Sequence, residues 1–594
     1  MVRVVAVRCK TWLIAAFALS TVVQAAEISH SDMEFSRISN TFLEGYLAWR
    51  PQMATDLGFH DRDGSITDYS LGSIQAERER LRHSVEALGR LRLAALNPQN
   101  RYDLQILRAA VANELMRFES LDAYRSNPMT YAGAIDINTY LKRNFAPFEQ
   151  RVRSIIRIER AAPVVFEHAR RNLHPSLAKP YVETAIEIAE GSATFLEKDL
   201  VQAVGNLEDA ALRREFEEVN LRAIQEVRGF AEWLKRERLP KSHLRYAIGR
   251  SAFHKMLREG ELIDLSPGRI LAIGLAELEK EKRRFAEAAA VIDPSKPAIE
   301  VFRQIQKDHP TVDGLIPDTT RNLERIRQYL IDRNLVSIPS EVRVKVKETP
   351  QFLRASSFAS MDTPGPFETR ATEAFYYVTP AEKEWPKERQ EEWLTAFNYY
   401  TTDVVSIHEA YPGHYLQALH VNASNATVLE KIFTSYAFVE GWAHYTEQMM
   451  IEEGFGDTPG KSSDSRESIL SRAKYRLAQS DEALLRLCRL CVAVKTHCQG
   501  MTLEEATRFF EQNCYYEAKP AYQEALRGTF DPGYCYYTLG KLQLLKLRDD
   551  YQREQGGKFS LRTFHDELLK RGSPPIRLLR EQLLQDTKIW PHIL

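Results

Sequence analysis

A run of amphipathic segments from about residue 31 to 335 is the feature that most restricts the fold of this 594-residue chain. In "SIQAERERLRHSVEALGRLRLAALNP", apolar residues recur at helical spacing: Ile74, Leu81, Val85 and Leu88. Ser73 is expected to cap this helix, and Asn97-Pro98 to end it. Similar patterns recur in "LRREFEEVNLRAIQEVRGFAEWLKRERLP" and "SPGRILAIGLAELEKEKRRFAEAAAVI". Because no fixed repeat period connects them, we predict a packed helical body rather than a regular solenoid.

A stretch between about residues 337 and 380 has a different texture. "SEVRVKVKETP" alternates as a strand does, and "EAFYYVTPA" is aromatic-rich and β-prone, whereas "SMDTPGPFE" between them reads as a turn-rich loop. Helical patterns return from Pro386, with a helix stop at Gly500 and a capping box from Thr502 to Glu505. We therefore expect a mainly α protein, a large helical body with a small β-sheet. Its N-terminal helical region would span 26–336 and the region with the candidate catalytic residues 337–594, in one continuous body.

The first residues have the pattern of a secretory signal peptide. "MVRVVAVRCKTWLIAAFALSTVVQAAE" has a basic start, an apolar run from Trp12 to Val23, and small residues at Val23 and Ala25. The apolar run falls short of the ~20 residues that span a bilayer, so an uncleaved anchor is the less favoured alternative. We expect residues 1–25 to be removed and the mature protein to be periplasmic or secreted, without stable membrane insertion.

The charge balance argues against two classes of partner. The formal net charge is −1, and the chain has no polybasic run. No global field would therefore attract nucleic acid or an anionic membrane surface. We expect no nucleic-acid partner.

Five cysteines remain beyond the signal segment, all in the last fifth of the chain: Cys488, Cys491, Cys498, Cys514 and Cys535. An odd number in an exported protein leaves at least one unpaired thiol or an intermolecular bond. Cys488 and Cys491 have C-x-x-C spacing within an amphipathic helical pattern. Without a second ligand pair at suitable spacing, they are expected to be small core residues and not a structural zinc site.

The stretch "VVSIHEAYPGHYLQALH" at 404–420 resembles a zinc-protease helix with an altered spacing. In H-E-x-x-H the two histidines lie four residues apart, on one helical face. Here they are His408 and His414, and a six-residue step turns a straight helix by ~600°, which places them on roughly opposite sides. Pro412 and Gly413 between them can kink the helix and return His414 to the face of His408.

A catalytic zinc requires three protein ligands, an open position for water and a carboxylate that takes the proton of that water. Glu409 supplies the carboxylate beside the first histidine. Glu440, on the otherwise apolar helix "TVLEKIFTSYAFVEGWAHYTEQMM", is the predicted third ligand. His444 and Glu447 share its helical face and are predicted to support the ligands or contact substrate. The alternative is a pair of capped core histidines around a structural kink.

Three segments resemble a widespread, mostly bacterial family that is known as domain of unknown function 885: "HEAYPGH", "EGWAHYTEQM" and "YTLGKLQLLKLR". Members of this family look like helical gluzincin-type zinc metallopeptidases, similar to angiotensin-converting enzyme, thimet oligopeptidase and neurolysin. Dipeptidyl peptidase III offers an analogy, since its zinc motif carries a one-residue insertion; the insertion implied here has two residues. The resemblance implies a deep active-site cleft beside the small sheet and one Zn²⁺ per chain.

Carried over by position, the resemblance assigns His408, His414 and Glu440 as zinc ligands and Glu409 as the general base. Tyr537, three residues before Gly540, matches a tyrosine of the family, and the similarity to other helical gluzincins makes it a candidate donor to the developing oxyanion. His497 in "THCQGMT" matches an L-H-x-x-G-x-T pattern and is a second candidate for that role.

Structural explanations remain open for the outer residues. Tyr537 lies in the aromatic cluster "YCYY" and reads equally well as a core residue. His497, near a helix C-terminus, suits a capping cation. Arg548 is a candidate for binding a substrate carboxylate, although an arginine on a late helix is more often solvated or structural.

The sequence thus predicts an exported zinc metallopeptidase that cleaves short peptides. The segment "ATEAFYYVTP" is expected to supply an edge strand that pairs with the extended substrate. Two alternatives remain: a zinc hydrolase of non-peptide amides or esters, and a catalytically inactive helical periplasmic binding or scaffold protein.

Overall fold

The described part of the chain is mainly α-helical, as the sequence predicts. The computed structural model describes residues 29–350, 354, 358–458 and 460–594, and the predicted signal peptide at 1–25 lies outside them. Within these residues, helices surround one small sheet of three strands. None of the described helices combines the length and the apolar character that a membrane span requires.

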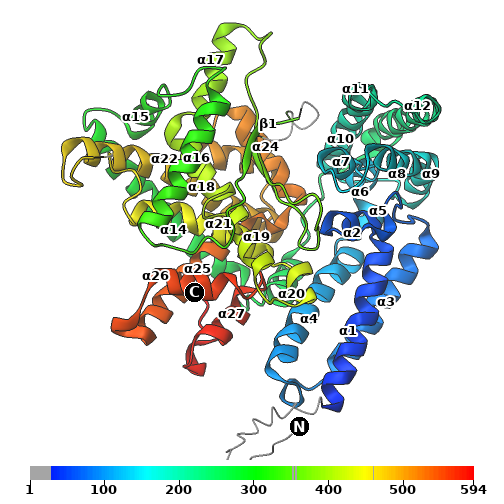
Figure 1. The fold of residues 1–594 in the computed structure, drawn as a ribbon, viewed down its shortest axis with the longest axis horizontal. Helices are drawn as coiled ribbons and strands as arrows, with labels where there is room; N and C mark the ends of the chain where they lie inside the picture. The colour runs from blue at the N-terminus through cyan, green and yellow to red at the C-terminus, as the bar shows by residue number, and fades with distance from the viewer. Residues whose placement is uncertain (1–28, 351–353, 355–357, 459) are drawn as a thin grey trace, which may run out of the picture.

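The N-terminal helices form a separate hydrophobic core, whose members run from Phe35 to Leu234, with a few contributions from later residues. Figure 1 shows this part in blue to cyan on the right, with α1, α3 and α4 side by side. The helices of this part are α1 (His30–Trp49), α2 (Pro51–Leu57), α3 (Leu71–Arg90), α4 (Pro98–Glu119), α5 (Ala123–Ser126), α6 (Met129–Ala132), α7 (Asn138–Lys142), α8 (Phe148–Arg160), α9 (Ala162–Asn172), α10 (Lys179–Glu197), α11 (Asp199–Val204) and α12 (Ala210–Trp233).

The predicted ends of the helix in "SIQAERERLRHSVEALGRLRLAALNP" are wrong. Helix α3 begins at Leu71, because the Ser70 hydroxyl and not that of Ser73 is the cap and accepts from the Ser73 backbone N–H. It ends at Arg90, well before Asn97, which instead caps α4 by accepting from the Asn100 N–H. Both serines satisfy the sequence rule, so only the packing of the preceding loop decides between them.

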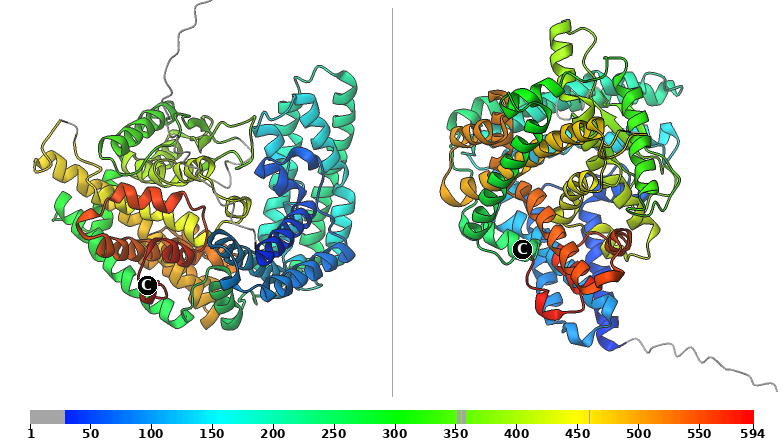
Figure 2. Two further views of the ribbon diagram at one scale, coloured as in Figure 1. Left: turned by 60° about the horizontal axis from the view of Figure 1, so that its bottom comes forward. Right: turned by 90° about the vertical axis from the view of Figure 1, so that its left-hand side faces the viewer.

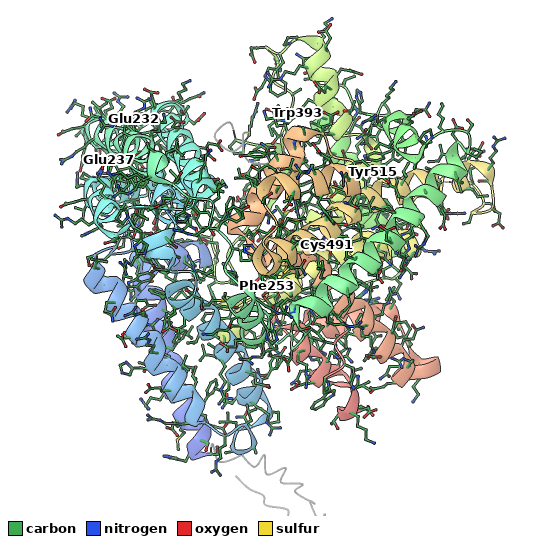
Figure 3. The ribbon with its side chains drawn as sticks, turned by 180° about the vertical axis from the view of Figure 1, so that it is seen from behind. Glu232, Glu237, Phe253, Trp393, Cys491 and Tyr515 are labelled. Atoms are coloured by element: carbon green, nitrogen blue, oxygen red, sulfur yellow. The ribbon has the colours of Figure 1, made fainter. Side chains whose placement is uncertain are left out.

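A second, larger core contains Met116 of α4 and otherwise runs from Phe253 to Ile593. The helices α14–α16 belong to it, although they precede residue 336. Figure 2 shows the two helical parts from two further sides, and Figure 3 labels Glu232 and Glu237 on one part and Cys491 and Tyr515 on the other. The helices before the sheet are α13 (Arg250–Lys255), α14 (Pro267–Ile292), α15 (Ala298–Ile305) and α16 (Leu315–Asp332).

The sheet has the order β1-β3-β2 and contains β1 (Lys345–Glu348), β2 (Ala359–Asp362) and β3 (Phe375–Val378). Strand β1 pairs with β3 in parallel, and β2 pairs with it in the antiparallel sense. Two predictions are corrected here. The start of "SMDTPGPFE" is strand and not loop, because β3 offers it a pairing edge that outweighs its weak intrinsic preference. The segment "ATEAFYYVTP" contains the central strand, so the edges are β1 and β2.

The helices after the sheet complete the second core. They are α17 (Lys387–Ala396), α18 (Tyr399–Glu409), α19 (His414–Ala423), α20 (Val428–Ile432), α21 (Tyr436–Glu452), α22 (Arg466–Gln499), α23 (Leu503–Cys514), α24 (Ala518–Phe530), α25 (Tyr536–Gln555), α26 (Leu561–Leu569) and α27 (Ile576–Leu583). The capping box from Thr502 to Glu505 is confirmed at the start of α23, and Gly500 ends α22 in the left-handed conformation. Cys488 and Cys491 are buried in the core with free thiols, as predicted.

Helices α21 and α25 cross in direct backbone contact at Gly441 and Gly540. A Cβ atom on Gly540 would lie 1.8 Å from the carbonyl oxygen of Ala437, and one on Gly441 would lie 2.5 Å from the backbone of Gly540. No larger residue fits at either position without separating the helices. The crossing brings Glu440, directly before Gly441, close to Tyr537, which lies three residues before Gly540 on the facing helix.

Candidate metal centre

The helix that carries the two histidines is broken, not merely kinked. Helix α18 ends at Glu409 and α19 begins at His414. A Cβ on Gly413 would lie 1.7 Å from the carbonyl oxygen of His408, so the turn passes this point only because the residue is glycine. The Trp442 indole N–H donates to the Pro412 carbonyl at 2.9 Å and fixes the turn to α21. The break brings the rings of His408 and His414 to 4.8 Å, perpendicular to each other.

The predicted third ligand meets both histidines. Oε2 of Glu440 lies 3.4 Å from Nε2 of His408 and 3.6 Å from Nε2 of His414. Two ligand atoms that each lie about 2.05 Å from a tetrahedral zinc ion are about 3.3 Å apart. This oxygen and Nδ1 of His414 are buried without a hydrogen-bond partner. The two separations from the Glu440 oxygen to the histidine nitrogens are thus close to those between ligands of one zinc ion.

Glu409 lies beside this ligand set. Its carboxylate and the histidine nitrogens of His408 and His414 have ligand atoms within 4.8 Å of one another. Oε2 of Glu409 accepts a hydrogen bond of 3.0 Å from the backbone N–H of Met361 in β2. The edge strand β2 therefore holds the carboxylate of the predicted base by a backbone hydrogen bond.

A second carboxylate, that of Glu447, holds the ring of His408 through its other nitrogen, Nδ1. Glu447 is fully buried on α21, and its Oε1 is 2.6 Å from Nδ1 of His408. Its Oε2 is 2.9 Å from Nδ1 of His444, and the Arg486 guanidinium lies 3.2 Å from Oε1. With Nδ1 of His408 donating to this carboxylate, the lone pair of Nε2 is left for a metal. The structure places the predicted supporting residues His444 and Glu447 in direct contact with each other.

The charges of these groups are strongly coupled. Burial opposes a positive charge on His408, yet the carboxylates of Glu440 and Glu447 outweigh it and raise its pKa to about 9. Burial also opposes a charge on Glu440, but His408 and His414 lower its pKa to about 2. The pKa of His414 is lowered, chiefly by burial. Glu447 keeps its charge in spite of burial, because Arg486 and the histidines hold its pKa well below the ordinary value.

Tyr537 lies against the ligand set. Its ring is nearly parallel to that of His408, with 6.4 Å between centroids, and the Arg489 guanidinium lies 5.1 Å from its centroid. Burial and the Glu440 carboxylate raise the pKa of Tyr537, while Arg489 and Arg527 lower it. The phenol therefore stays protonated and able to donate a hydrogen bond.

Residues 51–583 match the family described as "Bacterial protein of unknown function (DUF885)". The chain belongs to this family. The resemblance that the HEAYPGH, EGWA and YTLGK segments predicted is thus confirmed for DUF885, whereas the likeness to gluzincin peptidases stays a prediction.

Two solved structures share the fold over nearly the full length of this DUF885 protein. The first is titled "The structure of a putative lipoprotein of unknown function from Shewanella oneidensis"; it has a TM-score of 0.76 and 22% identity over 93% of this chain and 100% of the other. The second, "The crystal structure of the putative lipoprotein from Colwellia psychrerythraea", has a TM-score of 0.75 and 18% identity over 95% and 100%. At these identities the likeness concerns the fold alone. No curated protein matches the sequence.

Two other predicted residues are not brought to the ligands by any contact. His497 is buried, with Nδ1 accepting from the Ile248 N–H at 3.3 Å and Nε2 at 2.8 Å from the Gly528 carbonyl. Both ring nitrogens are therefore occupied by backbone groups. Arg548 lies over the ring of Tyr445 at 5.5 Å and 3.7 Å from Glu452. Each has a structural environment that accounts for it.

Sequence reasoning missed two groups that touch the site residues. Met361 contributes only its backbone N–H, which carries no residue-type signal. Arg486 lies in the long helix α22, where its position among other arginines gave no reason to select it. Its role becomes visible only in the structure, where its guanidinium is buried beside the Glu447 carboxylate.

Proposed function

We propose that this DUF885 protein is an exported zinc-dependent metallopeptidase that hydrolyses short peptides. The observation that carries the proposal is the convergence of Nε2 of His408, Nε2 of His414 and Oε2 of Glu440, with separations of 3.4 and 3.6 Å from the oxygen to the nitrogens. Two imidazoles and one carboxylate form a donor set that zinc uses in catalytic sites.

Zinc bound by these residues would polarise a carbonyl group and lower the pKa of a water molecule. Glu409 is suited to take the proton of the attacking water and to pass it to the leaving amine nitrogen. The Tyr537 phenol is suited to donate a hydrogen bond to the oxygen on which negative charge develops. Glu447 holds His408 in the tautomer that presents Nε2 to the ligand position.

The position of β2 favours a peptide as substrate over a non-peptide amide or ester. An edge strand offers backbone groups to which an extended peptide can add as a further strand. Strand β2 is the sheet edge that contacts Glu409, through the Met361 N–H. A peptide aligned along β2 would therefore present a carbonyl group next to the base.

Two observations support export. The N-terminal sequence has the pattern of a signal peptide. The two similar structures are of proteins whose titles call each a "putative lipoprotein", a class of protein that is carried across the inner membrane.

The test is the metal content of the purified protein together with cleavage of a peptide library. We expect about one zinc per chain in the wild type and in Glu409→Gln, loss of zinc in His408→Ala, and loss of cleavage in both variants. Acyl amides and esters are assayed in parallel, and their turnover without peptide cleavage would favour a zinc hydrolase of non-peptide amides or esters. A wild type without stoichiometric zinc, or peptide cleavage that survives Glu409→Gln, contradicts the proposal.

A further inference from the structure

The segment that joins β2 to β3 is fixed to the N-terminal helices by close backbone contact. Gly58 and Gly365 allow this contact, since a Cβ on Gly58 would lie 2.3 Å from the Glu368 nitrogen and one on Gly365 would lie 2.2 Å from the Asp56 oxygen. The rings of Phe59 and Phe367 stack beside it, with 4.5 Å between centroids. The N-terminal part therefore holds the segment that directly follows β2.

Arg143, in the N-terminal part, forms hydrogen bonds to both ends of this connection. Its guanidinium donates to Oδ1 of Asp362, the last residue of β2, at 2.5 Å. It also donates to the carbonyl oxygen of Glu373 at 2.6 Å and to that of Ala371 at 3.4 Å, just before β3. The side chain is buried, so water does not compete for these bonds.

Strand β2 is a four-residue edge strand whose residues are all half-buried. Within the described residues it pairs with β3, and Ala359 and Met361 pack against the larger core. Arg143 fixes its C-terminal end through Asp362, and Met361, next to Asp362, donates the backbone hydrogen bond to Glu409. A shift of β2 is therefore transmitted to the predicted base by one covalent step and one hydrogen bond.

We infer that Arg143 is a positioning residue for Glu409, acting through Asp362 and the Met361 N–H. This inference rests on the proposed function for its catalytic consequence only, since the effect on β2 is measurable by itself. It gives the N-terminal helices a role in the site although they carry none of its ligands. The metal ligands lie on α18, α19 and α21, so metal binding should not depend on Arg143.

The test compares Arg143→Ala and Arg143→Lys with Arg50→Ala in the full chain. Arg50 is the matched control, because it is also buried and its guanidinium donates to Tyr46, Glu77 and Glu114, which all lie in the N-terminal part and away from the segment around Arg143. Hydrogen exchange of a peptide that covers β2, zinc content, melting temperature and kcat with KM are measured for each variant.

We expect Arg143→Ala to speed exchange in β2, to lower kcat on the order of 10-fold and to leave the zinc content at the wild-type level. Arg143→Lys should restore part of the protection, since one ammonium can replace some of the bonds. Combined with Glu409→Gln, Arg143→Ala should lower the residual rate no further. Arg50→Ala is expected to lower the melting temperature without changing exchange in β2.

Unchanged exchange in β2, or equal exchange in the Arg143→Ala and Arg50→Ala variants, overturns the inference. If Arg143→Ala does not fold, Asp362→Asn provides the same measurements with Arg143 intact. A wild type that lacks peptidase activity would contradict the proposed function, while the exchange measurement would still decide the role of Arg143.

Discussion

Replacing Glu447 by glutamine should weaken zinc binding although Glu447 is not a ligand. The carboxylate accepts from Nδ1 of both His408 and His444. A glutamine side chain has the same shape but only one acceptor oxygen, and its amide nitrogen must donate. One of the two histidines then has to move its proton from Nδ1 to Nε2. For His408 that shift places the proton on the atom that should bind the metal.

The magnitude follows from the loss of charge and from this competition between tautomers. Mutation of a residue that supports a ligand usually costs 10- to 100-fold in metal affinity. That range corresponds to about 1.4 to 2.8 kcal/mol. We expect the upper half of the range, because Glu447 is fully buried and its bond to His408 measures 2.6 Å.

The assay is competition for zinc against a chromophoric chelator at pH 7, with wild type, Glu447→Gln and Glu452→Gln. Glu452 is the matched control: it lies on the same helix and accepts from Gln448 without touching a ligand. Melting curves of the metal-free forms separate loss of fold from loss of affinity. A zinc affinity of Glu447→Gln within twofold of the wild type, with the fold intact, would refute the tautomer argument.

Three further predictions concern other parts of the molecule. Gly540→Ala should lower the free energy of unfolding by about 3 kcal/mol and weaken zinc binding, because the added methyl group meets the backbone of α21. Gly557→Ala is the control and should do neither, since the space around Gly557 is open. Chemical denaturation and zinc titration measure the two effects. Tyr537→Phe should lower kcat by about 10²-fold with zinc content unchanged, and a drop in zinc content instead would indicate a structural role. Burial and the Glu430 carboxylate raise the pKa of Asp103 from 3.8 to about 7, so its contribution to stability is complete below pH 4 and is lost as the pH rises to 7. The loss corresponds to roughly 4 kcal/mol at most. Asp103→Asn should therefore reduce the fall of the melting temperature between pH 4 and 7. An equal fall in wild type and variant would contradict the raised pKa of Asp103.

Much of the fold was accessible from the sequence because helix signals are local. Periodicity located the helical regions, and the Thr502 capping box was placed correctly. The short strands were harder, since β2 consists of residues with weak strand preference that pair only because β3 is beside them. The central place of β3 in the sheet likewise depends on pairing across the chain, which no local pattern contains.

The ligand set was predictable for a different reason. His408, Glu409 and His414 lie close in sequence, and Glu440 is a carboxylate on an apolar helix, which is costly without a partner. His497 shows the limit of the same reasoning, because buried histidines satisfied by backbone groups carry the same sequence signal as functional ones. The contacts of Met361 and Arg143 arise from tertiary packing, and the residues next to them in the sequence do not predict these contacts.

Because α18 and α19 are separate helices, a metal ion at this site would also hold them together. On one continuous helix, two histidines keep their spacing whether or not an ion is present. Here His408 and His414 belong to different helices joined by a four-residue turn. An ion bound by both histidines would therefore cross-link the two helices. The region around α19 should therefore loosen when the ion is removed, and a cell could distinguish loaded from empty protein by its sensitivity to proteolysis.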